Sequence, residues 1–522
     1  MFSWRKDLFV MRIGCLQIDN FRCYDREVII DFDNLTAFVG KNDVGKSSIL
    51  EALDIFFNNS KGVTKLEKED ICNKGILNGD NEIRISVCFD SLPEYVVIDS
   101  TNKTNLSEEF LINAEGYLEI IKKYPNAGNE RVYISAYHPT NPECDELLMK
   151  KDTELREIIN KHNIPCSDRS KKSVMRKAIW DHFKDDLLLE TVEIDVAKGE
   201  AKVIWENLQK YFPVYSLFQS DRKNSDQDSE VQDPLKEAVK QIMRNEEIVG
   251  QLDSIAREVE SKLKEVSSRT MDKLREMSPE IASSLKPNIP SPSSLKWTDV
   301  FKGVTISSDD DIPLKKRGSG VRRLVLLNFF RAEAEKRCQE TQSGSIIYAF
   351  EEPETSQHNQ NQRMLIDAFK HLSESGNCQV IVTTHSAVIV KELNFENLRV
   401  IVSEEGKKII EPVDPDRLPY PSLNEVNYLA FSETTEEYHD ELYGYLVAEN
   451  LLNEYKYGKP LIPYKKQNDK DKSVKNRDLV LSEYIRNIIH HPENTNNSYT
   501  KDQLGESIQL MRDFIKSRNR KE

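Results

Sequence analysis

The chain has 522 residues, about three times the ~150 residues of a typical domain, so it can bury a large core without disulfides or metal ions. It carries 73 lysines and arginines against 88 aspartates and glutamates, which gives a formal net charge of −15. With 31% charged and 38% hydrophobic residues, and no apolar run near the ~18 residues of a membrane span, the composition predicts a soluble globular protein without membrane segments.

The first fourteen residues lack both the apolar core and the small-residue cleavage site of a secretory signal, so we expect a cytoplasmic protein. The eight cysteines contain no CxxC pair, and the nine histidines form no Cys/His cluster at zinc-ligand spacing. We therefore expect free thiols. The acidic total argues against wrapping the whole molecule around nucleic acid, but a local basic patch remains compatible with binding it.

The first elements in the chain alternate strands with one helix. Residues 12–18 and 28–32 alternate between apolar and polar side chains, which predicts two paired strands. Residues 35–39 are all compatible with burial and predict a short buried strand. Residues 48–57 place apolar side chains at helical spacing. The segment between the last two elements therefore joins a buried strand to a helix N-terminus.

That connecting segment, Gly40-Lys-Asn-Asp-Val-Gly-Lys-Ser47, matches the phosphate-binding pattern GxxxxGK[ST] at every fixed position. Gly40 and Gly45 let backbone N–H groups curl around a β-phosphate, and the helix N-terminus adds partial positive charge. Lys46 is expected to reach the β- and γ-phosphates, and the Ser47 hydroxyl to hold Mg²⁺. The pattern predicts a site for ATP with magnesium.

The middle of the chain is harder to interpret. Residues 82–89 alternate like a strand, whereas the polar stretch from residue 91 to about 230 has mixed signals and is interpreted as an inserted subdomain. Between residues 234 and 277 apolar side chains recur every three or four positions, which predicts a long helix or a helical hairpin. A globular helix pair and a coiled-coil arm both fit that spacing.

Further along, the apolar runs 345–350 and 379–383 predict two buried strands joined by a helix over 361–373, which implies a parallel sheet. The first run ends in Glu351 and Glu352. Ligands bind at the carboxyl edge of parallel strands, so these acids are expected to face the same site as the glycine-rich loop. Glu351 would complete the magnesium shell, and Glu352 would orient and deprotonate the attacking water.

Two further patterns point at phosphate. His385 follows the second run and could hydrogen-bond a γ-phosphate or the attacking water, although a histidine at a strand end is often structural. The segment Arg317-Gly-Ser319-Gly320 precedes a helix expected over 321–336 and offers N–H groups to an anion, although it also fits an ordinary helix cap.

Taken in order, NFR (Asn20 to Arg22), GKNDVGKS, RGSG, AFEEPE and TTHS resemble the motifs of ABC-type ATPases of the RecF, SMC and overcoming-lysogenisation-defect group. The resemblance covers about residues 1–90 and 295–411. It implies an α/β, ABC-type P-loop ATPase head with an inserted helical region. It also adds nucleotide-contacting residues to those of the glycine-rich loop; the full set it implies is Arg22, Gly40, Asn42, Gly45, Lys46, Ser47, Ser48, Ser319 and Gly320.

The resemblance further implies an ATP-dependent homodimer or higher oligomer, in which Ser319 and Gly320 of one copy cap the ATP of the other. Three departures bear on hydrolysis. GSGVR replaces LSGGQ, Glu351 stands where the family has an aspartate, and no Q-loop glutamine can be assigned.

Beyond residue 411 four prolines mark a linker, and the rest of the chain predicts a small all-α domain with helices over 442–455, 479–490 and 501–518. Its RNxxxH string, with Arg486 and His491, resembles HEPN domains, some of which are metal-independent ribonucleases. The resemblance implies that Arg486 stabilises the phosphorane-like charge and His491 transfers a proton. A helix-end pair that supports packing fits the string equally well. The basic stretch 465–477 would guide an RNA backbone.

We therefore expect five regions: the N-terminal lobe (1–90), the inserted subdomain (91–230), the helical arm (231–294), the C-terminal lobe (295–411), and the linker with the HEPN-like domain (412–522). The whole pattern resembles the PtuA-type ATPases of Septu and retron-associated anti-phage systems, which implies an HNH nuclease partner. A DNA-repair ATPase that clamps DNA, and a transporter ATPase, are the alternative classes.

Overall fold

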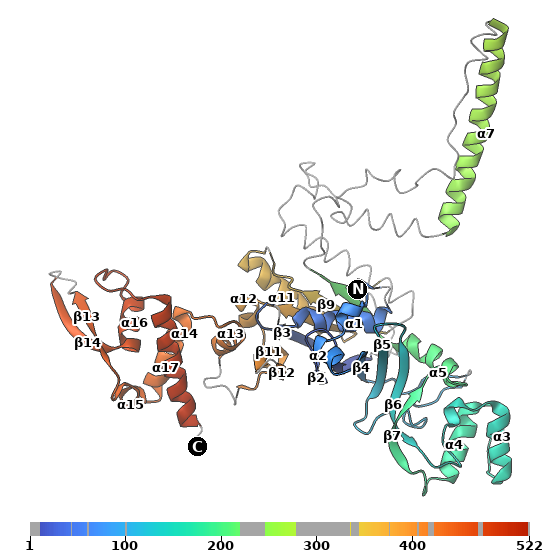
Figure 1. The fold of residues 1–522 in the computed structure, drawn as a ribbon, viewed down its shortest axis with the longest axis horizontal. Helices are drawn as coiled ribbons and strands as arrows, with labels where there is room; N and C mark the ends of the chain where they lie inside the picture. Colours follow the sequence, from blue (N-terminus) through green and yellow to red (C-terminus); the bar gives the residue numbers. More distant parts are fainter. Residues whose placement is uncertain are drawn as a thin grey trace. The chain divides into compact units, whose positions relative to one another are not determined.

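The computed structural model divides the chain into two compact units, residues 1–220 with 333–522, and residues 221–332. Figure 1 labels helices and strands of both units. The residues that the structure describes are 11–42, 44–59, 62–99, 102–219, 246–277, 335, 344–355, 357–374, 376–404, 407–415, 422–467 and 473–519. The expected Ser319 and Gly320 cap and the helix expected over 321–336 lie outside them.

The first unit contains a six-stranded sheet that holds the glycine-rich loop. Its strand order is β12-β11-β3-β10-β9-β8. All neighbours in it are parallel except β11 and β12, which pair antiparallel. The strands are β3 (Leu35–Val39), β8 (Val214–Phe218), β9 (Ile346–Glu351), β10 (Cys378–Thr384), β11 (Leu398–Glu404) and β12 (Lys407–Pro412). The expected parallel sheet, and with it the α/β fold class, is confirmed.

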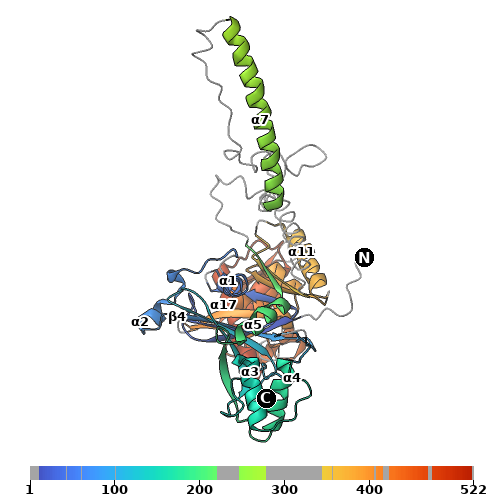
Figure 2. The same ribbon diagram turned by 90° about the vertical axis from the view of Figure 1, so that its right-hand side faces the viewer.

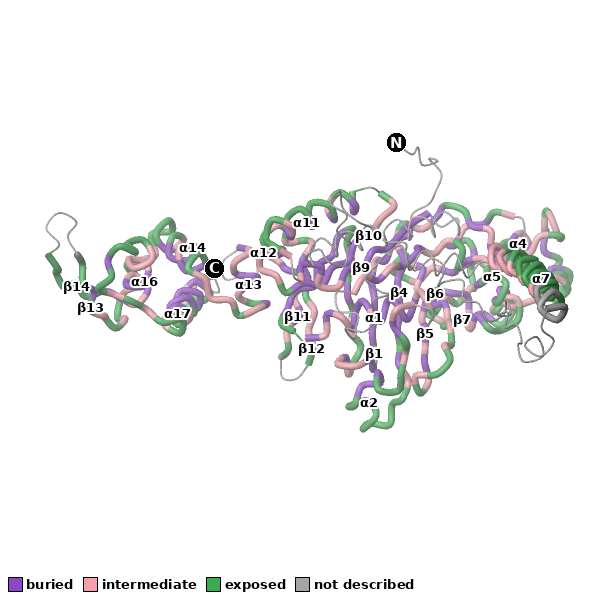
Figure 3. The backbone as a smooth tube through the Cα atoms, turned by 90° about the horizontal axis from the view of Figure 1, so that it is seen from above, coloured by how far each residue is buried: buried purple, intermediate pink, exposed green. Residues whose placement is uncertain are grey.

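The central strands of this sheet are buried, as their apolar sequences predict. Every residue of β3 is buried, and β10 pairs with β3 on one side and β9 on the other. Figure 3 shows β9 and β10 coloured mainly as buried. Among the described residues, α1 (Lys46–Asn58) follows β3, α11 (Asn359–Ser373) follows β9 and α12 (Ala387–Glu392) follows β10. Because β3, β9 and β10 are parallel, the residues after each of them meet at one edge of the sheet.

A second six-stranded sheet is antiparallel, with the order β2-β1-β4-β5-β6-β7. Its strands are β1 (Arg12–Asp19), β2 (Val28–Asp31), β4 (Glu82–Asp90), β5 (Leu118–Pro125), β6 (Arg131–Pro139) and β7 (Leu189–Asp195). The expected pairing of the first two strands is confirmed. From the region expected as an inserted subdomain, β5 to β7 extend the sheet that β1 and β4 begin, and β8 joins the other sheet. Buried side chains of both sheets form one continuous core.

Short helices border this second sheet, and α3 and α4 lie side by side (Figures 1 and 2). They are α2 (Asn73–Leu77), α3 (Asp152–Lys161), α4 (Lys172–His182), α5 (Ala201–Leu208), and the 3₁₀ turns Lys68–Asp70, Leu147–Met149 and Gln209–Tyr211. Arg176 of α4 is almost fully buried and pairs with Asp99 at 2.6 Å and Glu109 at 2.7 Å. Paired carboxylates allow a guanidinium to be buried in this way.

The C-terminal region begins after the 3₁₀ turn Phe395–Asn397, β11 and β12. Its helices are α13 (Leu423–Phe431), α14 (Glu436–Ala448), α15 (Leu452–Lys456), α16 (Leu481–His490) and α17 (Lys501–Asn519), and α14, α16 and α17 share one apolar core (Figure 1). The helices expected over 479–490 and 501–518 correspond to α16 and α17, whereas the one expected over 442–455 is divided between α14 and α15. The described residues also include two strands. Residues of the basic stretch 465–477 belong to two antiparallel strands, β13 (Leu461–Gln467) and β14 (Val474–Val480), where the sequence predicted no strand.

In the second unit the structure describes α7 (Glu246–Met277), which confirms the long helix predicted there. Exposed apolar side chains recur along it at Ile255, Val259, Leu263 and Val266. Three lysine or arginine residues on α7 pair with a glutamate four positions earlier. Among the helices that the structure describes, none is both long and apolar enough to cross a membrane.

Candidate active site

The glycine-rich loop leaves β3 and enters α1, and its backbone shape requires glycine at both ends. A Cβ on Gly40 would lie 2.8 Å from the Ile401 carbonyl oxygen. Gly45 has a φ of 109°, and a Cβ there would meet the Cys23 sulfur at 2.7 Å. The Tyr24 hydroxyl also donates to the Gly45 carbonyl at 3.0 Å. The loop is therefore held in a conformation that L side chains rarely adopt.

Lys46 is the first residue of α1, and its side chain is only 4% exposed. Its Nζ donates to the carbonyl oxygens of Gly40 at 2.8 Å and Lys41 at 2.9 Å. The same ammonium lies 3.8 Å from Glu352 Oε1. Lys46 thus links the loop to the carboxylate that follows β9.

Glu352 is fixed by its backbone as well as its side chain. Its φ is 41°, in the left-handed region that glutamate seldom occupies. The Glu352 N–H donates to the Thr383 carbonyl at 3.0 Å and contacts the Thr383 hydroxyl at 3.2 Å, which ties the end of β9 to β10. Strained backbone of this kind gathers at functional sites, where the surrounding structure holds it in place.

His385 completes the cluster at the end of β10. Its Nδ1 lies 3.3 Å from Glu352 Oε2 and 3.4 Å from Glu354 Oε1, while the ring is 42% exposed. In the part of the chain that the structure describes, Nε2 has no hydrogen bond, so this nitrogen is left for a ligand. The structure therefore brings together Lys46, Glu352 and His385 from three neighbouring strands.

Glu354 is a participant to which the sequence reading assigned no role. Its side chain is 3% exposed, and its Oε1 accepts from the Thr384 hydroxyl at 2.7 Å and the His385 N–H at 2.9 Å. Burial raises the pKa of Glu354, and these hydrogen bonds partly oppose that shift. Its second oxygen is buried without a partner among the described residues. Glu354 is thus a buried acid that orients His385.

Other predicted residues lie at the rim of the same edge. Asn42 is exposed, Ser47 is half-buried in the first turn of α1, and Ser48 is buried behind it. Glu351 ends β9 opposite Thr383. A hydroxyl and a carboxylate are oxygen ligands of the kind that Mg²⁺ prefers, and it keeps most of its waters. No cluster of three or more His, Cys, Asp or Glu side chains with metal-binding geometry occurs in the described ranges.

Arg22 is linked to this site indirectly, because it pairs with Glu51 of α1. It has a φ of 52°, and its guanidinium pairs with Asp70 at 2.8 Å and with Glu51, one turn after Ser47. Gln219, which directly follows β8, donates to the other Glu51 oxygen at 3.0 Å. No glutamine was assigned here from the sequence. The available signal was its position directly after a short apolar strand, which is also where His385 stands.

Arg486 and His491, the pair predicted in the C-terminal region, have different contacts. Arg486 lies over the Tyr443 ring at 4.8 Å, but His491 Nδ1 faces Glu493 at 3.1 Å and is largely exposed. The neighbouring His490 instead contacts α14, with its Nε2 2.9 Å from Asp440 Oδ2. Residues four apart share a helix face, so His490 rather than His491 lies on the face of α16 that carries Arg486.

Comparison with known proteins gives one family match. Residues 11–390 match the family described as AAA ATPase domain. No curated protein matches the chain with significance.

Among solved structures, the SMC head domain from Thermotoga maritima is 14% identical, covers 77% of this chain and 99% of its own, and has a TM-score of 0.31. The Smc head from Pyrococcus furiosus with an extended coiled coil, bound to the C-terminal domain of ScpA, is 14% identical, with coverages of 77% and 96% and a TM-score of 0.35. Structural similarity at these TM-scores supports no conclusion about function. The function of this chain is therefore argued from the family match and from the geometry of the site.

Proposed function

The chain belongs to the AAA ATPase domain family, and from this premise we propose that it is an ABC-type ATPase of the RecF and SMC kind that hydrolyses ATP at Lys46, Glu352 and His385. The observation that carries the proposal is the contact of the Lys46 ammonium with Glu352 at 3.8 Å, and of Glu352 with His385 at 3.3 Å. These are a phosphate-binding cation, a base and a hydrogen-bonding imidazole at one sheet edge.

In this proposal the triphosphate lies along the loop, and Lys46 exchanges its two carbonyl partners for the β- and γ-phosphates. Glu352 accepts a proton from a water as that water forms a bond to the γ-phosphorus. The bond from the γ-phosphorus to the bridging oxygen breaks, and ADP leaves with that electron pair. His385 donates from Nε2 to a γ-phosphate oxygen. Glu354 holds the imidazole in place through Nδ1.

Magnesium fits the residues at the rim. Ser47 and Glu351 would hold it, and when bound it neutralises charge on the phosphate oxygens. Arg22 and Gln219 would influence the nucleotide only indirectly, because both contact Glu51 on the second turn of α1. A change at the phosphate end of α1 would therefore reach β8 through Gln219.

We further propose that two copies close over ATP, with Ser319 and Gly320 capping the nucleotide of the partner, as the motif resemblance implies. The test is size-exclusion chromatography with light scattering in ATP and Mg²⁺. Glu352→Gln slows hydrolysis and should double the mass observed without ATP. Lys46→Ala should stay at the nucleotide-free mass. A Glu352→Gln chain that keeps one mass with and without ATP contradicts ATP-driven assembly.

For the C-terminal region we propose a nuclease role in anti-phage defence, either its own ribonuclease activity or control of an HNH nuclease. The supporting observation is charge. In a chain of net −15, the exposed side chains of Lys466, Lys475 and Arg477 share one hairpin face, and Lys466 pairs directly with Lys475. Like charges directly opposite each other are unfavourable in a sheet, and a phosphate backbone would relieve them.

Within this proposal His490 and His491 are both tested, because His490 shares a face of α16 with Arg486. We expect that His490→Ala and Arg486→Ala abolish RNA cleavage by the purified chain while ATP hydrolysis persists, and that His491→Ala has little effect. Cleavage that appears only on adding an HNH nuclease, in an ATP-dependent way, supports control of a partner. Absence of both activities rejects the nuclease role.

A DNA clamp built on α7 is less well supported. Three of its described basic side chains pair with glutamates of the same helix: Lys262 with Glu258, Lys264 with Glu260 and Arg269 with Glu265. This pattern of alternating charge is typical of a solvated helix rather than a track for phosphates.

A further inference from the structure

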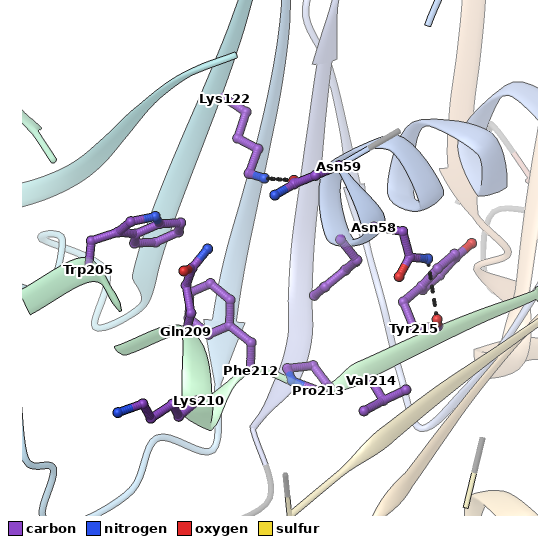
Figure 4. Close-up of a pocket in the computed structure, with 11 residues that line it drawn as sticks. Asn58, Asn59, Lys122, Trp205, Gln209, Lys210, Phe212, Pro213, Val214 and Tyr215 are labelled. Carbon is purple, nitrogen blue, oxygen red and sulfur yellow. Dashed lines mark hydrogen bonds between the residues drawn. The ribbon is translucent and has the colours of Figure 1, made fainter. Parts of the chain in front are cut away.

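A cavity of about 390 Å³ lies at the opposite end of α1 from the ATP site (Figure 4). It is bounded by the last turn of α1, by β5, by the turn after α5 and by the start of β8. Its volume is within the range of small-molecule sites, which is roughly 300–1,000 Å³. Nothing in the proposed ATPase mechanism uses it.

Aromatic rings with fixed positions form the walls. Phe57 stacks on Tyr215 with centroids 5.5 Å apart, and Phe212 stacks on Phe89 at 4.8 Å. Trp205 meets the edge of Phe212 at 5.5 Å. Phe57 and Phe212 each pack on Phe89, which does not line the cavity, and the Tyr215 hydroxyl donates to the Leu50 carbonyl at 2.7 Å. These contacts hold the walls in place without a ligand. Such walls suit a flat, apolar-faced ligand.

The same cavity presents hydrogen-bonding groups whose orientation is set by their other contacts. Asn58 donates through its amide nitrogen to Asp54 at 2.7 Å and to the Tyr215 carbonyl at 3.4 Å, which leaves its oxygen as an acceptor (Figure 4). Asn59 accepts from the Lys122 ammonium, which leaves its NH₂ as a donor. Among the described residues, the Trp205 indole N–H and the Gln209 amide also have no partner.

Lys122 supplies no charge to a ligand. Its side chain is 4% exposed, pairs with Glu130 at 2.8 Å and lies over the Phe56 ring at 5.1 Å. The interior therefore favours an uncharged ligand group. The nearest lining cation in contact with solvent is Lys210, which is exposed and donates to Asn207 at 2.8 Å. A phosphate would thus lie outside, at the mouth.

We propose that this cavity binds the base of a nucleoside 5′-monophosphate, with the ring between the aromatic walls and its polar edge on Asn58, Asn59 and Gln209. The Asn58 oxygen and the Asn59 NH₂ offer an acceptor beside a donor. Amide side chains recognise the edges of bases by hydrogen bonds of both kinds. The alternating donors and acceptors of a nucleobase match this lining, whereas a hydrocarbon would leave them unpaired.

Both elements at the cavity lead to the ATP site. α1 begins at Lys46, and β8 is followed by Gln219, which hydrogen-bonds Glu51. A bound base would contact the last turn of α1 and the first residues of β8. We expect it to alter ATP hydrolysis by severalfold, and this regulatory step alone rests on the proposed function.

Binding is tested in the full chain carrying Lys46→Ala, so that failure of the ATP site cannot affect the result. AMP, GMP, CMP and UMP are titrated by calorimetry and by tryptophan fluorescence. At least one should bind saturably and quench Trp205. Gln209→Trp, at an exposed position on the mouth, should weaken binding at least tenfold. Lys202→Trp, on the exposed surface of α5 away from the cavity, should leave it unchanged.

Circular dichroism melting of both tryptophan variants confirms that they fold. No saturable binding of any monophosphate, or equal binding by Gln209→Trp, overturns the proposal. Tight binding of a decanucleotide with none of the monophosphates also overturns it, because the occupant would then be a nucleic-acid strand.

Discussion

Two histidines show how differently the ATPase region and the C-terminal region use the same side chain. His385 follows a parallel strand, is 42% exposed and faces two carboxylates, with Nε2 left for a ligand. His439 of α14 is fully buried, and its Nε2 contacts the Ser507 hydroxyl at 2.9 Å. That hydroxyl bonds Ser482 at 2.8 Å, and Ser482 bonds Tyr455 at 2.6 Å. An acid partner with solvent access prepares a histidine for chemistry, whereas a buried hydroxyl chain makes it part of the core.

The largest predicted effect is a loss of stability at acid pH, caused by His439 in the C-terminal region. Burial, with repulsion from Arg486 and His490, lowers the pKa of His439 to about 4, although the Asp440 carboxylate lies 4.0 Å away. An unfolded histidine takes up its proton near pH ~6.5. Between these values the unfolded state binds more protons, so the free energy of unfolding should fall by about 3 kcal/mol as the pH drops from ~6.5 to ~4.

Urea unfolding followed across this pH range measures the effect. His439→Gln keeps a donor toward Ser507 but cannot titrate, so its stability should lose this component of the acid dependence. Identical pH profiles for the two chains would mean that His439 is not the group responsible.

The next largest effect concerns the acid that orients His385. Glu354→Gln keeps an oxygen for Thr384 and the His385 N–H but removes the charge that faces Nδ1. We expect kcat for ATP hydrolysis to fall about tenfold with KM unchanged, because binding does not involve Glu354. Steady-state kinetics measure both constants. A rise in KM with kcat unchanged would place Glu354 in binding instead of positioning.

A smaller loss should follow from interrupting the hydroxyl chain beside His439. Ser507→Ala leaves His439 and Ser482 without one buried partner, so the free energy of unfolding should fall by about 1–2 kcal/mol. Ser517→Ala is the matched control, because this hydroxyl lies on the same helix but is exposed. Equal urea midpoints for the two variants would show that the chain contributes nothing to stability.

The smallest effect should come from the ion pair of Lys391 on α12 with Glu437 on α14, where both side chains are in contact with solvent. Lys391→Ala should change the free energy of unfolding by less than about 1 kcal/mol, and 1 M salt should reduce the difference further. A loss as large as that of Ser507→Ala would mean that this surface contact is coupled to the core.

Much of the ATPase region follows from its sequence, because its strands are short apolar runs and the glycine-rich loop has a fixed pattern. The adjacency of Lys46, Glu352 and His385 follows in turn from parallel strands ending at one edge. The role of Glu354 could not be predicted, because its hydrogen-bond partner Thr384 lies thirty positions later in the chain. The antiparallel extension by β5 to β7 also escaped prediction, because strand partners are chosen by tertiary packing.

In the C-terminal region the sequence was less informative. The hairpin carries lysine and aspartate where strands usually carry β-branched side chains, so it resembled a loop. The pair of Arg486 with His491 stays a prediction, because the spaced string that suggested it does not take the helical period into account. One residue turns a side chain by about a quarter of a circle, enough to leave the face that Arg486 occupies.

The most direct test of the central claim is phosphate release from ATP in the presence of Mg²⁺ by the wild-type chain and by Glu352→Gln, with Glu396→Gln as an exposed control. We expect steady turnover by the wild type and the control, and a loss of at least about 100-fold for Glu352→Gln with ATP still bound. Equal turnover by the wild type and Glu352→Gln would contradict the assignment of this edge as the ATPase site.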